Sequence, residues 1–478
     1  MKPDRTPSTT APTGDPATAG PVGTGRPVGR RAVLSAVGLA GVVGMTGCVP
    51  GSTSGSGGSS ASPSAGPVST DVAAAGPVTL TVWDQNTDGG IAVAQKQLNA
   101  QFTAKYPNVT IKRVSRSFAD LKTTLKLALS GNDAPDVVQA NQGYPDMGAF
   151  VQAGLLSPLG SYAPLYSWTD RFPADLLSLN SFTADGATWR TGNLYGISQT
   201  GEIVGVYYNK KLLVKAGVTA PTTMTQFRTA LPKVEAAGVL PIQYGDASKS
   251  PGIHLYGAVI SAVAGEKAAS DLVSGAGGAW TDADPVQAAT IVHDWATQGY
   301  LPPGANGVTG DDAVAAFAKG EGAFFVSGTW QLATVTQGLG ADGGFVALQG
   351  RDGKPETLGG VGLAWAMTSK TKHPDVAAAY IDFVTNAASS KVLVDTGNLP
   401  VVLPSGYAPA TGTVNGDIVA QWRQVSQKGG LVPYLDYATP TFYDTLSGAV
   451  QQLTGGKASP QQFATTLQTD YAAFEKGR

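Results

Sequence analysis

The stretch that begins near Val78 repeatedly switches between strand and helix periodicity. Apolar and polar residues alternate in short segments, which predicts strands. Between them, apolar residues recur three and four positions apart, as at Leu121, Leu125 and Leu129, which predicts helices. Connections of this length between successive strands imply parallel pairing, so the chain is predicted to be an α/β protein. The first strands are expected at 78–83, 109–114 and 136–139, and the first helices at 91–106 and 118–130.

The chain is long enough for two compact lobes. It has 478 residues, and about 400 of them follow the low-complexity segment that ends near residue 77, which is too many for one core. Charged residues make up only 14% of the chain, and no cluster of Lys and Arg occurs after residue 48. The composition therefore argues against nucleic-acid binding.

Residues 1–47 have the order of a secretory signal peptide. Arg30 and Arg31 precede an apolar run over 32–45, and a small-residue junction leads to Cys48, the only cysteine. At 14 residues the run is too short to span a bilayer. The junction resembles a bacterial lipobox, which implies a lipidated Cys48, and the arginines resemble a Tat export signal. The alternative is that Cys48 is a stray thiol in a discarded leader.

Residues 48–77 are almost wholly small or polar and are expected to form a flexible tether. A coil of this length would span roughly 30 Å. No apolar run after Cys48 approaches the 18 residues of a membrane span. We therefore expect an extracytoplasmic protein, held at the outer face of the cell membrane by a lipid on Cys48.

Several short motifs occur in one collinear order between residues 78 and 476. Together they resemble extracellular solute-binding proteins of ABC transporters, in the carbohydrate-binding branch that includes maltose-binding protein. The first to be noted is a hinge-region signature built from residues 194–197, Glu202 and residues 207–210, and the collinear order of the motifs carries the resemblance. The remaining motifs are residues 134–138, 317–323, 328–330, 359–362, 369–375, 398–401 and 456–460.

The resemblance implies a two-lobe periplasmic-binding-protein-like fold with a ligand cleft between lobes that are not contiguous in sequence. Lobe 1 would comprise residues 78–198 plus about 365–428, and lobe 2 about 204–358 plus 429–478. The hinge would lie near 198–204 and 359–364. The implied function is the substrate-binding component of an ABC importer, a monomer without cofactor that passes a neutral sugar or oligosaccharide to permease subunits.

Sugar chemistry indicates which side chains to look for. An aromatic ring stacks on the apolar face of a pyranose, and carboxylates or amides bridge neighbouring hydroxyls. Trp330 follows a predicted strand and a glycine, and Glu202 lies in the first crossing segment. For Trp330, Trp365 and Tyr434 the alternative is a place in the core. The expected ligand-binding residues are Trp330, Glu202, Asp84, Gln85, Asn141, Gln142, Asp246, Trp365, Tyr434 and Asp436.

Two other classes remain open. A secreted glycoside hydrolase would need two carboxyls across a cleft, and Glu202 with Asp246 or Asp436 could supply them. A binding protein of the same fold could take a non-sugar solute. The three histidines lack metal-ligand spacing, and neither a G-x-S-x-G elbow nor a Walker A loop occurs. The neutral polar and aromatic candidates favour a neutral polyol.

Overall fold

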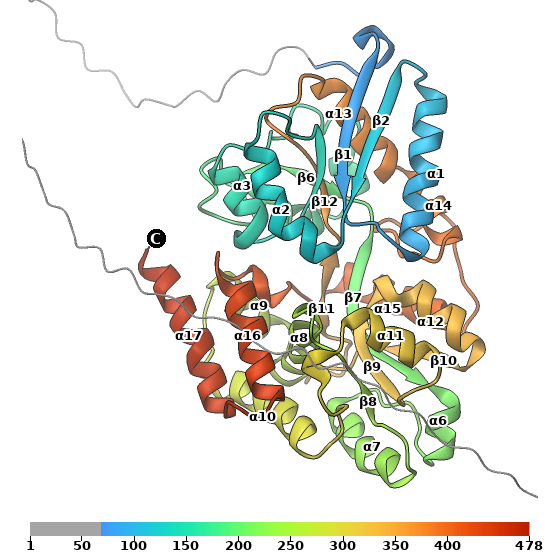
Figure 1. Cartoon of the computed structure of the whole chain (residues 1–478), viewed down its shortest axis with the longest axis vertical. Helices are drawn as coiled ribbons and strands as arrows, with labels where there is room; N and C mark the ends of the chain where they lie inside the picture. Colours follow the sequence, from blue (N-terminus) through green and yellow to red (C-terminus); the bar gives the residue numbers. More distant parts are fainter. Residues whose placement is uncertain (1–67, 478) are drawn as a thin grey trace, which may run out of the picture. The chain divides into compact units, whose positions relative to one another are not determined.

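The computed structural model describes residues 68–477 (Figure 1). The signal peptide, Cys48 and most of the expected tether lie outside the described residues. Within residues 68–477, no helix is both long and apolar enough to cross a bilayer.

The first sheet contains the three strands expected near the start of the body. β1 pairs in parallel with β2 and β3, as the strand–helix alternation predicts. β12 comes from much later in the chain and pairs antiparallel with β3 and β6. The predicted α/β class is therefore confirmed. In sheet order the strands are β2 (Val109–Ser115), β1 (Val78–Asp84), β3 (Val137–Ala140), β12 (Ala364–Met367) and β6 (Gly196–Ser198).

Local sequence explains where the helices beside the first sheet begin and which face they bury. The Ser117 side chain accepts a hydrogen bond from the Asp120 backbone N–H and caps α2, whose three leucines at i, i+4 spacing are buried. α1 packs against α13 and α14. The larger helices here are α1 (Gly89–Lys105), α2 (Phe118–Ser130), α13 (Pro374–Thr385) and α14 (Ala387–Asp395).

A group of short elements lies between β3 and β6 in sequence. They include a two-stranded sheet in which β4 and β5 pair antiparallel. The elements are η2 (Tyr144–Gly148), α3 (Ala149–Gln152), α4 (Trp168–Arg171), α5 (Ala174–Ser178), β4 (Ser181–Phe182) and β5 (Asn193–Leu194).

The second sheet is built around β7, which pairs antiparallel with β11 near its start and with β9 and β10 along its later part. β8 pairs in parallel with β9, and β13 with β11. Its strands are β13 (Leu431–Val432), β11 (Thr357–Val361), β7 (Gly201–Asn209), β9 (Phe324–Gly328), β8 (Ile242–Gln243) and β10 (Gly343–Val346).

Helix α8 (Ser250–Ala264) is the central helix beside the second sheet, and most of its residues are buried. It packs against β9, β11, α10 and α16. α16 and α17 lie side by side near the C-terminus (Figure 1). The other helices here are α6 (Lys210–Lys215), α7 (Met224–Ala236), α9 (Glu266–Ser274), α10 (Ala283–Thr297), α11 (Gly310–Ala318), α12 (Leu332–Leu339), α15 (Val414–Lys428), α16 (Phe442–Thr454) and α17 (Pro460–Lys476).

The chain passes between the two sheets at short connections. β6 leads into β7 through residues 199–200, and β11 leads into β12 through residues 362–363. These connections touch, since the Gly362 N–H donates to the Thr200 carbonyl at 2.9 Å. Residues 399–401 run alongside, because the Gly201 N–H donates to Leu399 and the Val401 N–H to Gln199. Three segments distant in sequence therefore lie together where the sheets are joined.

Helix α15 lies with the second sheet, although the sequence led us to expect residues up to about 428 in lobe 1. The Asp417 carboxylate accepts a hydrogen bond from the Phe345 N–H of β10 at 3.2 Å, and the Gln421 side chain also bonds to this strand. Helix α15 also packs on α12, which lies with the second sheet. We therefore propose that the chain leaves lobe 1 and enters lobe 2 in the segment near residues 399–413, before α15 begins.

Candidate ligand pocket

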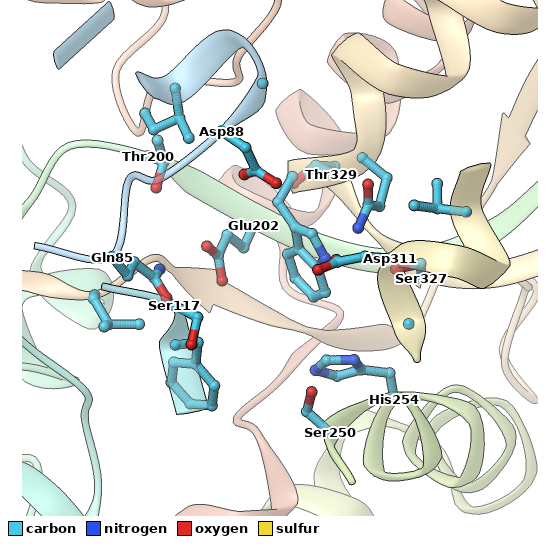
Figure 2. A pocket seen from close by; sticks show the side chains of 18 of the residues that line it. Gln85, Asp88, Ser117, Thr200, Glu202, Ser250, His254, Asp311, Ser327 and Thr329 are labelled. Carbon is cyan, nitrogen blue, oxygen red and sulfur yellow. The ribbon is translucent and has the colours of Figure 1, made fainter. Parts of the chain in front are cut away.

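A pocket of about 590 Å³ is lined by residues from both sheets. This volume lies in the range of sites for small organic ligands. The first sheet contributes residues that follow β1, β2 and β3 at their carboxyl ends, where ligands bind in open α/β sheets. Figure 2 shows Gln85, Ser117, Glu202, His254 and Asp311 around the space.

Four of the predicted residues from the first crossing and the strand ends line this pocket. Gln85 follows β1, Asn141 follows β3, and Glu202 lies on β7 directly after the crossing. Gln85 is held by its backbone, since its N–H donates to the Gln139 side chain at 2.9 Å. Trp330 lies in η4 (Thr329–Gln331), which follows β9.

Trp330 is unusual for a tryptophan because 38% of it is exposed, and it lines the pocket. Its ring packs against His254 on α8, with centroids 4.9 Å apart and planes tilted by 54°. Burial lowers the pKa of His254 to about 4, so its imidazole is neutral at pH 7 and offers one donor and one acceptor. Trp330 and His254 together give this side of the pocket an aromatic surface, and the imidazole adds one hydrogen-bond donor and one acceptor to it.

Glu202 and Tyr434 connect the first crossing to the C-terminal part of the chain. The Tyr434 hydroxyl donates to Glu202 Oε2 at 3.0 Å. Burial raises the pKa of Glu202 to about 7, and the Tyr434 hydrogen bond opposes this rise. Both residues line the pocket, and both were predicted. Near neutral pH, Glu202 therefore has a proton to exchange with a ligand or with solvent.

Asp436 also lines the pocket and is only 6% exposed. Burial raises its pKa to about 6, while the charge of Lys122 opposes the rise. Next to it, the Tyr437 hydroxyl donates to the Asn141 and Gln142 side-chain oxygens at 3.2 and 3.0 Å. Residues 434–437 comprise η6 (Leu435–Tyr437) and the residue before it. This segment thus contacts the loop that follows β3.

Asp88 and Asp311 add two carboxylates to the pocket lining. Asp88 precedes α1 and Asp311 lies in the first turn of α11. Partial burial raises the pKa of Asp311, and the neighbouring carboxylates of Asp88 and Asp312 add to the rise. Their side chains point into the space in Figure 2.

Asp84 does not line the pocket, contrary to our prediction. Its fully buried carboxylate forms an ion pair with Arg113 at 2.5 Å and accepts hydrogen bonds from Ser115 and the Asn86 N–H. Gln142 is also wrong as a pocket residue: it is 1% exposed, and its amide donates to Asn180 and to the Gly362 carbonyl. Both side chains fix the loops beside the pocket and have little capacity left for a ligand.

Asp246 and Trp365 are likewise structural. Asp246 is fully buried, and its Oδ1 accepts the Gly252 N–H at the start of α8. Trp365 lies on β12 inside the first sheet, fully buried, so its core alternative is correct. The indole N–H of Trp365 donates to the side-chain oxygen of Gln199, a pocket residue, at 2.5 Å.

The sequence analysis missed several pocket residues. His254 was counted only among three histidines that lack metal-ligand spacing, and Asp88 and Asp311 were not among the predicted ligand-binding residues. The available signal was position, since each lies at or near the start of a helix, α1 for Asp88, α8 for His254 and α11 for Asp311. Among residues 68–477, no group of three or more His, Cys, Asp or Glu side chains could hold a metal ion.

The sequence model of the bacterial extracellular solute-binding protein family matches residues 83–391. An ABC transporter extracellular-binding protein of Pyrococcus horikoshii is 24% identical over 353 residues, which cover 69% of this chain and 73% of that protein. The multiple sugar-binding protein of Streptococcus mutans is 22% identical over 338 residues, covering 68% of this chain and 75% of that protein.

Solved structures give the same fold. A chitin oligosaccharide binding protein superposes with a TM-score of 0.72 at 23% identity, covering 84% of this chain and 100% of that one. Such neighbours have the two-lobe periplasmic-binding-protein fold, which agrees with two separate sheets joined by short crossings. With the family match spanning well over half of its length, the chain belongs to the bacterial extracellular solute-binding proteins.

Proposed function

We propose that this protein is the substrate-binding component of an ABC importer and that it binds a sugar or short oligosaccharide in the pocket between the two sheets. The observation that supports this best is the lining itself. An exposed indole, Trp330, stands near hydroxyl, amide and carboxylate groups, which is the combination that a pyranose ring requires. The multiple sugar-binding and chitin oligosaccharide binding relatives support the same class of ligand.

The pocket disfavours acidic sugars. None of its lining residues, all within the described part of the chain, is Lys or Arg. A carboxylated or phosphorylated sugar would therefore meet carboxylates without a compensating cation. The sequence analysis predicts a neutral sugar, and the amide and hydroxyl groups of the lining support binding of its hydroxyls.

A thermal-shift screen of mono- and oligosaccharides tests the ligand class. Ligand at 100 times its dissociation constant should add about 2.7 kcal/mol to the free energy of unfolding. Chromatography of the sugars in the same samples tests the hydrolase alternative, because a hydrolase would cleave them. Asp246 lies outside the pocket, which leaves Glu202 and Asp436 as the carboxyls for that alternative. Cleavage that disappears in a Glu202→Gln variant would replace the binding proposal.

We further propose that the protein acts outside the cytoplasm, as a monomer anchored through a lipid on Cys48. The signal-like order of residues 30–48 and the tether composition support this. Mass spectrometry of the membrane fraction should find a mature chain that begins at a lipidated Cys48. A Cys48→Ala variant should leave the membrane fraction, and full-length cytosolic protein in the wild type would contradict the proposal. Stimulation of a reconstituted permease by the loaded protein tests the importer partner.

A further inference from the structure

His254 is a polar side chain of the pocket lining without a hydrogen-bond partner in the described part of the chain. It lies on α8, and its ring extends into the space in Figure 2. The ring packs against the rings of Trp330 and Tyr434, with centroids 4.9 and 5.9 Å away. Within residues 68–477, neither ring nitrogen forms a hydrogen bond, and neither is fully buried. Both nitrogens can therefore be reached from the pocket.

Packing against Trp330 does not by itself require a histidine at this position. An apolar ring would contact the indole without removing polar nitrogens from water. Burial already lowers the pKa of His254 to about 4, so the imidazole is neutral at pH 7 and has lost part of its hydration. A polar group in this situation needs a partner, and in a pocket the natural partner is a group of the ligand.

A hydroxyl is the ligand group that suits a neutral imidazole best. One ring nitrogen donates a hydrogen bond and the other accepts one. A hydroxyl can accept from the N–H or donate to the bare nitrogen, so it binds whichever nitrogen faces it. A carbonyl oxygen would bind only the N–H, and an ammonium only the bare nitrogen. A neutral imidazole also adds no charge to the pocket, which agrees with the neutral sugar proposed above.

The position of His254 beside Trp330 indicates which ring of the ligand carries this hydroxyl. The indole is 38% exposed, so it has surface available for stacking. A pyranose stacked on it would extend its rim of hydroxyls toward the groups beside the indole, and His254 is one of them. On the other side of His254, the Tyr434 hydroxyl is already used, since it donates to Glu202 at 3.0 Å. The imidazole is therefore left for the ligand.

We propose that His254 is a specificity-determining residue, and that one of its ring nitrogens hydrogen-bonds a hydroxyl on the rim of the sugar ring stacked on Trp330. This rests on the proposed carbohydrate-binding function and deepens it, because one hydroxyl of the ligand becomes a requirement. A sugar that lacks this hydroxyl would leave the imidazole unpaired beneath it and should bind more weakly.

The His254→Phe variant tests the hydrogen bond separately from the packing. Titration calorimetry with glucose, galactose, mannose, maltose, cellobiose, xylobiose and N,N′-diacetylchitobiose first identifies a sugar that binds. His254→Phe keeps an aromatic ring against Trp330 but removes both nitrogens, so it should bind that sugar about five- to tenfold more weakly. Thermal melts and tryptophan fluorescence without sugar should match those of the wild type.

His373→Phe is the matched control. His373 is also partly exposed, but it precedes α13 and does not line the pocket. The same substitution there should leave the affinity for the sugar at its wild-type value.

Monodeoxy analogues of the bound sugar identify the hydroxyl that His254 binds. In the wild type, removal of this hydroxyl should weaken binding by about tenfold. In His254→Phe the same removal should have little effect, because the partner of the hydroxyl is already gone. His373→Phe should keep the wild-type difference.

Nuclear magnetic resonance of isotope-labelled histidine reports the contact directly. The chain has only three histidines, His254, His293 and His373. Spectra of His293→Phe and His373→Phe assign the remaining signal to His254 by elimination, so this measurement does not depend on His254→Phe being folded. Saturating sugar should shift the ring-nitrogen signals of His254, and the analogue without the critical hydroxyl should shift them less.

The outcomes separate the role of His254 from carbohydrate binding itself. If His254→Phe binds the sugar as tightly as the wild type, or if the His254 signals do not respond to saturating sugar, the role of His254 is overturned while carbohydrate binding stands. An undiminished effect of every monodeoxy analogue in His254→Phe also overturns it, because His254 would then only support Trp330. If none of these sugars binds the wild type, carbohydrate recognition fails and the role of His254 fails with it.

Discussion

Tyr434 donates a 3.0 Å hydrogen bond to Glu202, joining a residue near the C-terminus to the first crossing between the sheets. The bond stabilises the ionised form of Glu202, whose pKa is raised to about 7 by burial. Two groups separated by 232 positions therefore set one charge in the pocket.

Tyr434→Phe should make ligand binding more dependent on pH. Without the hydroxyl, the pKa of Glu202 rises above about 7, so less of the carboxylate is ionised at neutral pH. Affinity that depends on the carboxylate should fall at pH 7 and recover at higher pH. Calorimetric titrations from pH 6 to pH 9 measure this, and parallel wild-type and variant profiles would contradict the assignment.

Trp330→Ala should reduce ligand affinity by a few kcal/mol, on the scale of aromatic hot spots, with little change in the melting temperature. The side chain is 38% exposed and lines the pocket, so the core loses little. Trp365→Ala is the contrast, because Trp365 is fully buried and should cost about 3–5 kcal/mol of stability. If Trp330→Ala melts much lower yet binds normally, Trp330 is structural.

Gly328→Ala should act on the pocket through Trp330. A Cβ at Gly328 would lie 1.9 Å from the Trp330 ring, so the indole must move. We expect a loss of affinity comparable with that of Trp330→Ala, together with altered tryptophan fluorescence. Gly448→Ala on α16 is the control, since a Cβ there meets nothing within 4 Å; it should leave affinity unchanged and stabilise by roughly 0.5–1 kcal/mol.

Asp246 should make the protein less stable as pH rises. Burial raises its pKa from 3.8 to about 7, so the folded protein keeps a proton that the unfolded chain loses between those values. The free energy of unfolding should therefore fall by a few kcal/mol from pH 4 to pH 7 and then level off, at about 1.36 kcal/mol per pH unit.

Asp246→Asn should reduce the dependence of stability on pH by the Asp246 contribution, leaving the contributions of Glu202 and Asp436, whose pKa values are also raised. The amide keeps the Oδ1 acceptor for the Gly252 N–H at the start of α8, and it carries no charge into the core. Denaturant unfolding of both proteins at several pH values gives the comparison. A slope as steep in the variant as in the wild type would show that Asp246 does not contribute to the pH dependence.

The elements with strong local signals were predicted closely. Ser117 caps α2 and Gly131 follows its last residue, so the predicted range 118–130 is that of the structure. Trp330 was placed correctly because a strand and a glycine precede it. These features are encoded within a few residues of sequence.

Two of the errors, at Asp84 and Trp365, came from pairing between distant strands. Asp84 is neutralised because β2 runs beside β1, which brings Arg113 and Ser115 against it. Trp365 is buried because β12 enters the first sheet between β3 and β6. Neither neighbour lies near in sequence, so no local pattern could separate a ligand-facing carboxylate or indole from a buried one.

The segment that holds Tyr434, Asp436 and Tyr437 lies beyond residue 391, where the family match ends. The region that the family sequence model matches and part of the pocket lining thus lie in different stretches of the chain. Substitutions in this short segment can change the chemistry offered to a solute while both sheets and their crossings stay intact. A change of ligand preference could then arise near the C-terminus, beyond the region that the family sequence model matches.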